Sequence, residues 1–264
     1  MRLARTITSL APSIVTRKFI RTAATFAALA ACLLAGMAVI SRGDQNREDS
    51  NIDPAKVERG LAIAPVQLTY SPKKRNLVGY GSWLVNAVGD CNGCHTAGAP
   101  PNFNYANGFN PYFAQPTKVD PTVYLGGGQE FGQVGFDPNT GALQGPVIIS
   151  RNLTPNYTGR AEGGNTFDQF LQIIRHGTDL DHLHPPCTGP NTPENCIIPP
   201  TDGNVLQVMP WPTFNNMSNL DLFAIYTYLS AVPCYPGPAT VADLPPEQQY
   251  AFSALHNDCT APAP

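Results

Sequence analysis

Most of this 264-residue sequence is poor in basic residues. Six of its 16 Lys and Arg residues lie within residues 1–43, which contain no Asp or Glu, so residues 44–264 carry 10 basic residues against 19 acidic ones, a formal net charge of −9. Binding to nucleic acid needs clustered Lys and Arg side chains that neutralise phosphates. The acidic body therefore argues against nucleic-acid binding and favours protein partners that present a basic face.

The sequence also lacks an internal repeat and long helical runs. Its 27 Pro and 23 Gly residues are spread between short periodic segments and are not collected in one tail. This distribution predicts a mainly α protein with few helices and long irregular loops. The length is enough for a buried core in one or two domains.

Only one long apolar run is present, from Thr22 to Ile40, and Arg17, Lys18 and Arg21 precede it. Basic, apolar and then polar segments are the order of a secretory signal. The run is about 19 residues long, near the lower limit for spanning a bilayer, and no small-x-small cleavage site stands out, so a cleaved signal and a retained membrane anchor both stay open. Residues 29–32 (Leu-Ala-Ala-Cys) also resemble a lipoprotein box that would lipidate Cys32, although apolar residues continue after it. Each alternative exports the rest of the chain.

Cys91 and Cys94 lie two residues apart and His95 follows directly, in the segment Cys-Asn-Gly-Cys-His. This is the attachment motif of a c-type haem, in which both thiols form thioethers to the porphyrin and the imidazole binds the iron. A redox dithiol would favour a preceding strand in a βαβ unit, whereas a helix leads into this segment. A zinc site would need a second ligand pair, and a simple disulfide is the remaining alternative. The motif predicts one covalent haem c with His95 as proximal iron ligand.

An iron held by His95 has one further axial position. Met209 is the best candidate, because Pro210 and Pro212 restrict the backbone around it and Val208 and Trp211 supply an apolar wall. The sequence also offers Met217, which we interpret as a core residue near a helix start, and His176, which suits the last turn of a helix. His182 and His184 have a metal-like spacing but no third ligand nearby, so we interpret them as a solvated loop; His256 is a further candidate.

Four cysteines are left after Cys32 and the haem pair are set aside: Cys187, Cys196, Cys234 and Cys259. Two disulfides, 187–196 and 234–259, are the simplest pairing, although four cysteines permit three connectivities. Four free thiols would be unusual in an oxidising compartment. The second bridge would close a Pro-rich tail that has little hydrophobic content of its own.

Composition and motifs divide the chain into an N-terminal signal or anchor (1–43), a tether and lead-in segment (44–74) and a domain with one haem-attachment motif and a disulfide-closed tail (75–264). A helix is expected from about Asn76 to the haem motif, with Gly79 and Gly81 allowing another helix to pack closely. Residues 96–121 read as an irregular loop, and short strands, forming a small β-hairpin, are expected between Tyr124 and Arg151. Two further helices are expected after capping boxes at residues 166–169 and 218–221; the first ends at Gly177 and the second before residue 233.

In combination, several motifs resemble exported bacterial class I cytochromes c, especially the cytochrome subunits of membrane-bound alcohol and gluconate dehydrogenases. These motifs are residues 81–85, 89–95, 150–155, 174–177 and 208–211, and the resemblance spans about residues 75–232. It implies a haem-wrapping fold in which the first and last helices cross, with Gly81 and Trp83 meeting Tyr226. It also implies that His95 and Met209 are the two axial ligands and that Arg151 and Asn152 lie near the haem. Unlike those subunits, this chain has one haem motif, long insertions at 98–147 and 178–207, and a cysteine-closed tail.

These observations predict a monohaem electron-transfer protein of the bacterial periplasm, soluble or held at the membrane by its N-terminal segment. Iron with His and Met ligands changes little in geometry between oxidation states and therefore moves single electrons between a redox donor and an acceptor. Such a protein is not an enzyme alone. The alternatives are a cytochrome subunit of a membrane-associated dehydrogenase or terminal oxidase complex and a haem enzyme or sensor with an open iron site.

Overall fold

The computed structural model describes residues 51–96, 104–184, 196–197 and 204–263. The chain divides into two units, residues 1–51 and 52–264, and the second unit is the one considered below. The predicted signal or anchor, Cys32 and Cys187 lie outside the described residues. Within the described ranges, no helix has the length and apolar character needed to cross a membrane.

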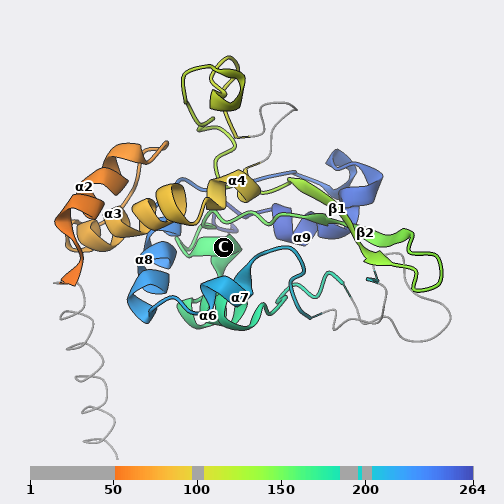
Figure 1. Cartoon of the computed structure of the whole chain (residues 1–264). Coiled ribbons are helices and arrows are strands. Elements are labelled where there is room, and N and C mark those ends of the chain that lie inside the picture. Colours follow the sequence, from red (N-terminus) through yellow and green to blue (C-terminus); the bar gives the residue numbers. More distant parts are fainter. Residues whose placement is uncertain (1–50, 97–103, 185–195, 198–203, 264) are drawn as a thin grey trace, which may run out of the picture. The chain divides into compact units, whose positions relative to one another are not determined.

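Short helices and a β-hairpin make up the described part of this unit (Figure 1). The α-helices are α2 (Pro54–Ile63), α3 (Arg75–Trp83), α4 (Cys91–His95), α5 (Ala161–Gly164), α6 (Phe167–His176), α7 (Trp211–Phe214), α8 (Asn219–Leu229) and α9 (Phe252–Leu255). Strands β1 (Glu130–Phe136) and β2 (Leu143–Ile149) pair antiparallel. Shorter helical turns are Pro72–Lys74, Leu84–Val88, Pro111–Phe113, Val241–Asp243 and Pro246–Ala251.

Glycines let α3 pack tightly between α2 and α8. A Cβ atom on Gly81 would lie 2.0 Å from the carbonyl oxygen of Ala224 in α8, and one on Gly79 would lie 2.7 Å from Val57 in α2. The prediction that small residues permit close helix packing is confirmed. The specific pairing with Tyr226 is wrong, because Tyr226 faces α6, where its ring lies 5.6 Å from that of Phe170.

Residues 52–74 are part of the segment 44–74 that the sequence predicted as a tether and lead-in, and they lie within the folded unit. In α2, Val57 is 1% exposed, and the carbonyl oxygen of Gly60 accepts a hydrogen bond of 2.7 Å from the hydroxyl of Ser82. The segment looked like a tether because its few apolar residues give a weak pattern. They are nevertheless enough to cover one face of α3.

The expected helix from residue 76 to the haem motif is interrupted. Helix α3 ends at Trp83, a π-helical turn runs from Leu84 to Val88, and Asp90 adopts a left-handed conformation with φ 46° before α4 begins. The left-handed residue ends the preceding helical turn, so α4 begins as a separate helix. The motif therefore has its own orientation, set at Gly89 and Asp90.

The other two predicted helices are confirmed with their caps. Thr166 and Gln169 form the capping box of α6, which ends at Gly177 with φ 66°. Ser218 and Asp221 form the capping box of α8. Apolar residues of both helices, among them Phe170, Ile174, Leu222 and Leu229, enter the same buried cluster.

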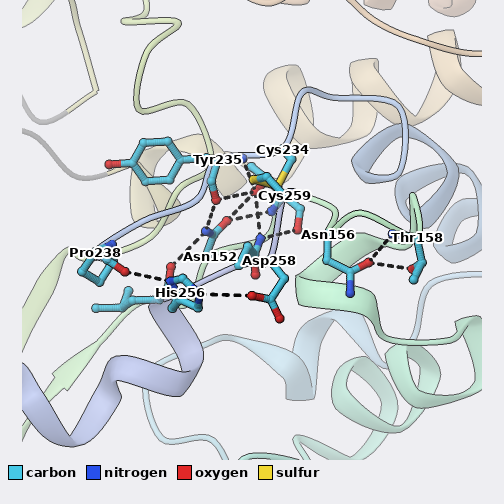
Figure 2. The surroundings of a disulfide bond; sticks show 12 residues. Asn152, Asn156, Thr158, Cys234, Tyr235, Pro238, His256, Asp258 and Cys259 are labelled. Carbon is cyan, nitrogen blue, oxygen red and sulfur yellow. Dashed lines mark hydrogen bonds and ion pairs between the residues drawn. A yellow bond between two sulfur atoms is a disulfide. The ribbon is translucent and has the colours of Figure 1, made fainter. Parts of the chain in front are cut away.

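Beyond α8, the tail returns across the segment that follows β2. Cys234 and Cys259 form a disulfide with a Cα–Cα distance of 5.6 Å, as the sequence predicts. Near this bridge, Asn152 donates hydrogen bonds to the carbonyl oxygens of Tyr235 and Leu255 (Figure 2). Cys196 is also disulfide-bonded, while its expected partner, Cys187, lies outside the described residues.

Candidate functional site

A cavity of about 420 Å³, the main cavity, lies between α4 with the turn before it and later segments from β1 to α8. Its lining includes Cys91, Cys94, His95, Arg151 and Met209. The remaining wall is mostly apolar, with side chains from the end of β2, α6, α7 and α8; examples are Ile148, Ile174, Phe214, Leu222 and Leu229. Ligand pockets for medium-sized organic molecules commonly have this size and this apolar character.

The two thiols of α4 are separated by about one helical turn and both face the main cavity. They are not bonded to each other. Burial raises the pKa of the Cys91 thiol to about 12 and also raises the pKa of Cys94, with the nearby Asp90 carboxylate adding to both effects. Redox dithiols have lowered thiol pKa values, so these two cysteines lack the electrostatic environment of such a site.

The imidazole of His95 is oriented by the backbone of a distant segment. Its Nδ1 lies 2.8 Å from the carbonyl oxygen of Arg151, and because a carbonyl only accepts, Nδ1 carries the proton. The Nε2 atom is then unprotonated in the neutral ring and can act as a ligand. Burial lowers the pKa of His95 and favours that neutral form. Iron-binding and zinc-binding histidines are typically oriented in this way.

Three of the candidate second ligands line the main cavity: Met209, Met217 and His184. Met209 precedes α7, and the backbone N–H of Trp211 donates to its carbonyl at 2.8 Å. His184 is 5% exposed and its ring lies 5.3 Å from that of Tyr250, so the interpretation of His184 as part of a solvated loop is wrong. His176 is exposed in the last turn of α6, in agreement with its predicted helix-terminal place.

His182 and His256, the remaining candidate ligands, each hydrogen-bond to a residue that is not a metal ligand. The Nδ1 of His182 lies 2.7 Å from the side-chain oxygen of Asn204, and His256 hydrogen-bonds to the carbonyl oxygen of Pro238. Within the part of the chain that the structure describes, no three His, Cys, Asp or Glu side chains are grouped closely enough to bind a metal ion. The surroundings of His182 and His256 therefore do not support a zinc-type centre at either residue.

Arg151 contributes to the main cavity in two ways. Its carbonyl oxygen orients His95, and its guanidinium forms ion pairs with Asp179 and Asp181. Asp179 is 1% exposed and also accepts hydrogen bonds from the backbone N–H groups of Asp181 and Leu183. A buried carboxylate needs such compensation. The segment after β2 and the segment after α6 are therefore held together beside the cavity.

Asn152 and Trp211, two of the predicted haem-environment residues, are not among the residues that line the main cavity. The side chain of Asn152 makes its hydrogen bonds to the C-terminal tail and to Thr154. The indole N–H of Trp211 donates to the carbonyl oxygen of Leu206 at 3.1 Å, and its ring lies against Gly177. Both side chains support segments of the wall.

Sequence reasoning missed Glu162 and Asp179, which line the main cavity. Glu162 lies in α5, where its own φ is 49° and that of Gly163 is 69°, so this turn is irregular. The only signal for it in the sequence is the Glu-Gly-Gly segment, which predicts a turn and no function. Asp179 follows α6 without any recognisable motif.

Comparison of the chain with protein-family models, with curated proteins and with solved structures finds no match.

Proposed function

We propose that this chain is an exported c-type cytochrome that holds one covalent haem and carries single electrons between redox partners in the bacterial periplasm. The observation that carries the proposal is the convergence of Cys91, Cys94, His95 and Met209 on one largely apolar cavity. The thiols and His95 come from α4, whereas Met209 comes from a segment more than 100 residues later.

The residues fit a c-type haem in three respects. The two thiols lie beside the cavity for thioether formation, and His95 offers an unprotonated Nε2 because its Nδ1 hydrogen-bonds to Arg151. The apolar wall would cover a porphyrin and exclude water, which raises the reduction potential. When bound, the haem supplies a reversible one-electron carrier; the chain anchors it, fixes its axial ligand and shields it.

Several features support the cellular context and the fold of this proposal. The order of basic, apolar and polar segments at residues 17–44 suits export, and the Cys234–Cys259 disulfide suits an oxidising compartment. The close contact of α3 with α8 through Gly81 is the kind of helix crossing expected for a class I cytochrome c fold. The acidic body favours donors and acceptors with basic docking faces.

A second candidate is a cytochrome subunit of a larger dehydrogenase or oxidase complex. Large apolar side chains are exposed on the loop around Tyr112 and Phe113, which are 83% and 56% exposed, and on the hairpin at Phe136 and Leu143, which are 45% and 65% exposed. Exposed apolar side chains of this size are common where another protein docks. Co-purification of a flavoprotein or quinoprotein in stoichiometric amount would favour this candidate over a free carrier.

The ligand assignment is tested by Met209→Ala, with Met217→Ala and His184→Asn as matched variants on the same cavity. The wild-type ferric protein should show the near-infrared sulfur-to-iron charge-transfer band. Met209→Ala should abolish that band, lower the potential and open the iron to carbon monoxide, because the thioether that favours ferrous iron is lost. The other two variants should keep it.

Loss of the band in Met217→Ala with retention in Met209→Ala would transfer the ligand role to Met217. Absence of the band from the wild type would favour His184 or an open iron site, as in a haem enzyme or sensor. Absence of any covalent haem after expression with a haem-attachment system would refute the proposed function as a whole.

A further inference from the structure

A second, smaller cavity of about 140 Å³ adjoins the main cavity. Arg151 and Glu162 are the two residues that line both cavities. The second cavity is largely polar, since its lining also includes Asp181, His256 and Asn257. Its volume is large compared with the roughly 10–15 Å³ that one water requires in a cavity with polar partners. The second cavity, which is polar and large enough for water, therefore adjoins the apolar main cavity at Arg151 and Glu162.

Glu162 is held in its place by backbone and side-chain contacts. Its N–H donates to the carbonyl oxygen of Leu153 at 3.2 Å, and the N–H of Gly163 donates to that of Thr154 at 3.1 Å. The side-chain amide of Asn165 lies 3.5 Å from Oε2 of Glu162. The carboxyl group is therefore fixed beside the segment that also carries Arg151 and orients His95.

The surroundings favour the protonated form of this carboxyl group. Burial raises the pKa of Glu162 to about 7, against smaller lowering effects of Asn165 and Arg151. Arg151 compensates little because its guanidinium is paired with Asp179 and Asp181. A carboxyl group with a pKa near neutrality can gain or lose its proton in response to a modest change in a nearby charge.

Two other ionisable groups near Glu162, His256 and Tyr226, make hydrogen bonds of their own. His256, whose side chain is 31% exposed, donates to the carbonyl oxygen of Pro238 and has Asp258 3.4 Å from its Nε2, as Figure 2 shows. The hydroxyl of Tyr226 in α8 donates a hydrogen bond of 2.7 Å to the carbonyl oxygen of Asn165, and burial raises the pKa of Tyr226.

On the main cavity, Asp90 is exposed, and His95 and His184 are the two imidazoles. Neither histidine lines the second cavity. Asp90 does not line it either. Among the described residues, Glu162 is the only one with a carboxyl group that lines both cavities.

We propose that Glu162 binds a proton when the haem is reduced and releases it when the haem is oxidised, through water in the second cavity. This inference rests on the proposed function. On reduction, one electron passes from the donor protein to the site, and one proton from bulk solvent binds a carboxylate oxygen of Glu162, which becomes a neutral acid. Oxidation by the acceptor reverses both transfers, so the net charge of the site stays constant. The coupling arises because a charge change in a poorly solvated site interacts strongly with a nearby ionised group.

The test is the midpoint potential of the full-length haem protein, measured by redox titration at a series of pH values on both sides of neutrality. The wild-type potential should fall as pH rises, because reduction takes up a proton. The reduction equilibrium constant should change by up to tenfold per pH unit, which corresponds to about 59 mV for a one-electron couple. Glu162→Gln should flatten this dependence around neutral pH, since the amide keeps the shape but cannot titrate.

Two further variants separate titration from structure. Glu162→Asp retains a carboxyl group and should keep a pH-dependent potential with a shifted midpoint. Glu247→Gln makes the same chemical change at an exposed residue far from either cavity lining and should behave as wild type. Infrared difference spectra should show a carboxylic-acid carbonyl band that forms on reduction in the wild type and is missing in Glu162→Gln.

A wild-type potential that does not change with pH, or a slope that persists in Glu162→Gln, would overturn the inference. A persistent slope would assign the proton to another group, such as a haem propionate. Either result would leave the proposed function intact, because the potential itself can only be measured on a protein that has bound haem. A protein without covalent haem would instead refute the proposed function.

Discussion

At the scale of single residues, the site depends on backbone groups and polar side chains that support its ligands. His95 is oriented by a carbonyl group, and the residue that supplies it, Arg151, uses its side chain for a separate task, the pairing with Asp179 and Asp181. The side chain of the next residue, Asn152, donates hydrogen bonds to carbonyl oxygens of the C-terminal tail. Two adjacent residues thus have different roles: Arg151 contacts the main cavity, and Asn152 stabilises the packing of the tail.

Asn152→Ala should destabilise the protein without changing the proposed haem site. The buried amide donates to two tail carbonyl groups and accepts from Thr154, and leaving those groups unpaired costs about 1–3 kcal/mol of unfolding free energy. Denaturant unfolding should therefore shift, while the absorption spectrum and potential stay near wild type. Asn139→Ala, in the exposed hairpin turn, is the control and should be neutral. A clear shift in potential with unchanged stability would instead favour the direct haem contact that the resemblance implies.

At the scale of elements, the helices meet at positions where a side chain would not fit. Gly81 in α3 lies against the backbone of α8, and Gly79 and Gly60 bring α2 and α3 equally close. This close approach fixes α3, and the π-helical turn after it sets the start of α4. The start of the Cys-x-x-Cys-His segment therefore depends on packing at residues about ten positions earlier in the chain.

Gly81→Ala should loosen this packing. The added methyl group would lie 2.0 Å from the carbonyl oxygen of Ala224, so α3 or α8 must move, at a cost of about 1–3 kcal/mol in unfolding free energy. Thermal unfolding followed by circular dichroism measures the loss. Asn76→Ala on the exposed side of α3 adds helix propensity without a clash and serves as the control. Equal stabilities of the two variants would show that the helices can separate at no cost.

At the scale of the whole molecule, the folded unit begins earlier than the cytochrome domain expected from sequence. Helix α2 covers α3 with Val57 and binds Ser82 through Gly60, and the Cys234–Cys259 bridge ties the tail near its other end. Both additions lie outside the span of the recognisable motifs, residues 81–211. They extend the core without contributing residues to the main cavity.

Truncation separates these parts. A chain that begins at residue 52, exported with a foreign signal, should bind haem and unfold at nearly the same temperature as the longer chain. A chain that begins at residue 75 lacks α2 and exposes the face of α3 that Val57 covers, a side chain whose burial contributes about 1.5–3 kcal/mol. It should unfold at a lower temperature or fail to accumulate. Equal melting temperatures of the chains that begin at residues 52 and 75 would show that residues 52–74 act only as a tether.

Features determined by near neighbours could be predicted from the sequence alone. The capping boxes at Thr166 and Ser218 join residues three positions apart, and the Cys-x-x-Cys-His spacing is itself the haem-attachment prediction. The Cys234–Cys259 pairing follows from the grouping of cysteines around one tail. In each case the chain between the partners is short, so few arrangements compete.

The tertiary structure decided which distant segments meet at the motif. In the folded chain, His184 lines the main cavity, the carbonyl oxygen of Arg151 accepts a hydrogen bond from His95, and Glu162 lines both cavities. These contacts span more than 50 residues and depend on the packing of α3 against α8 and on the left-handed backbone at Asp90 and Glu162. No local pattern encodes them, because they arise when separately determined elements share one core.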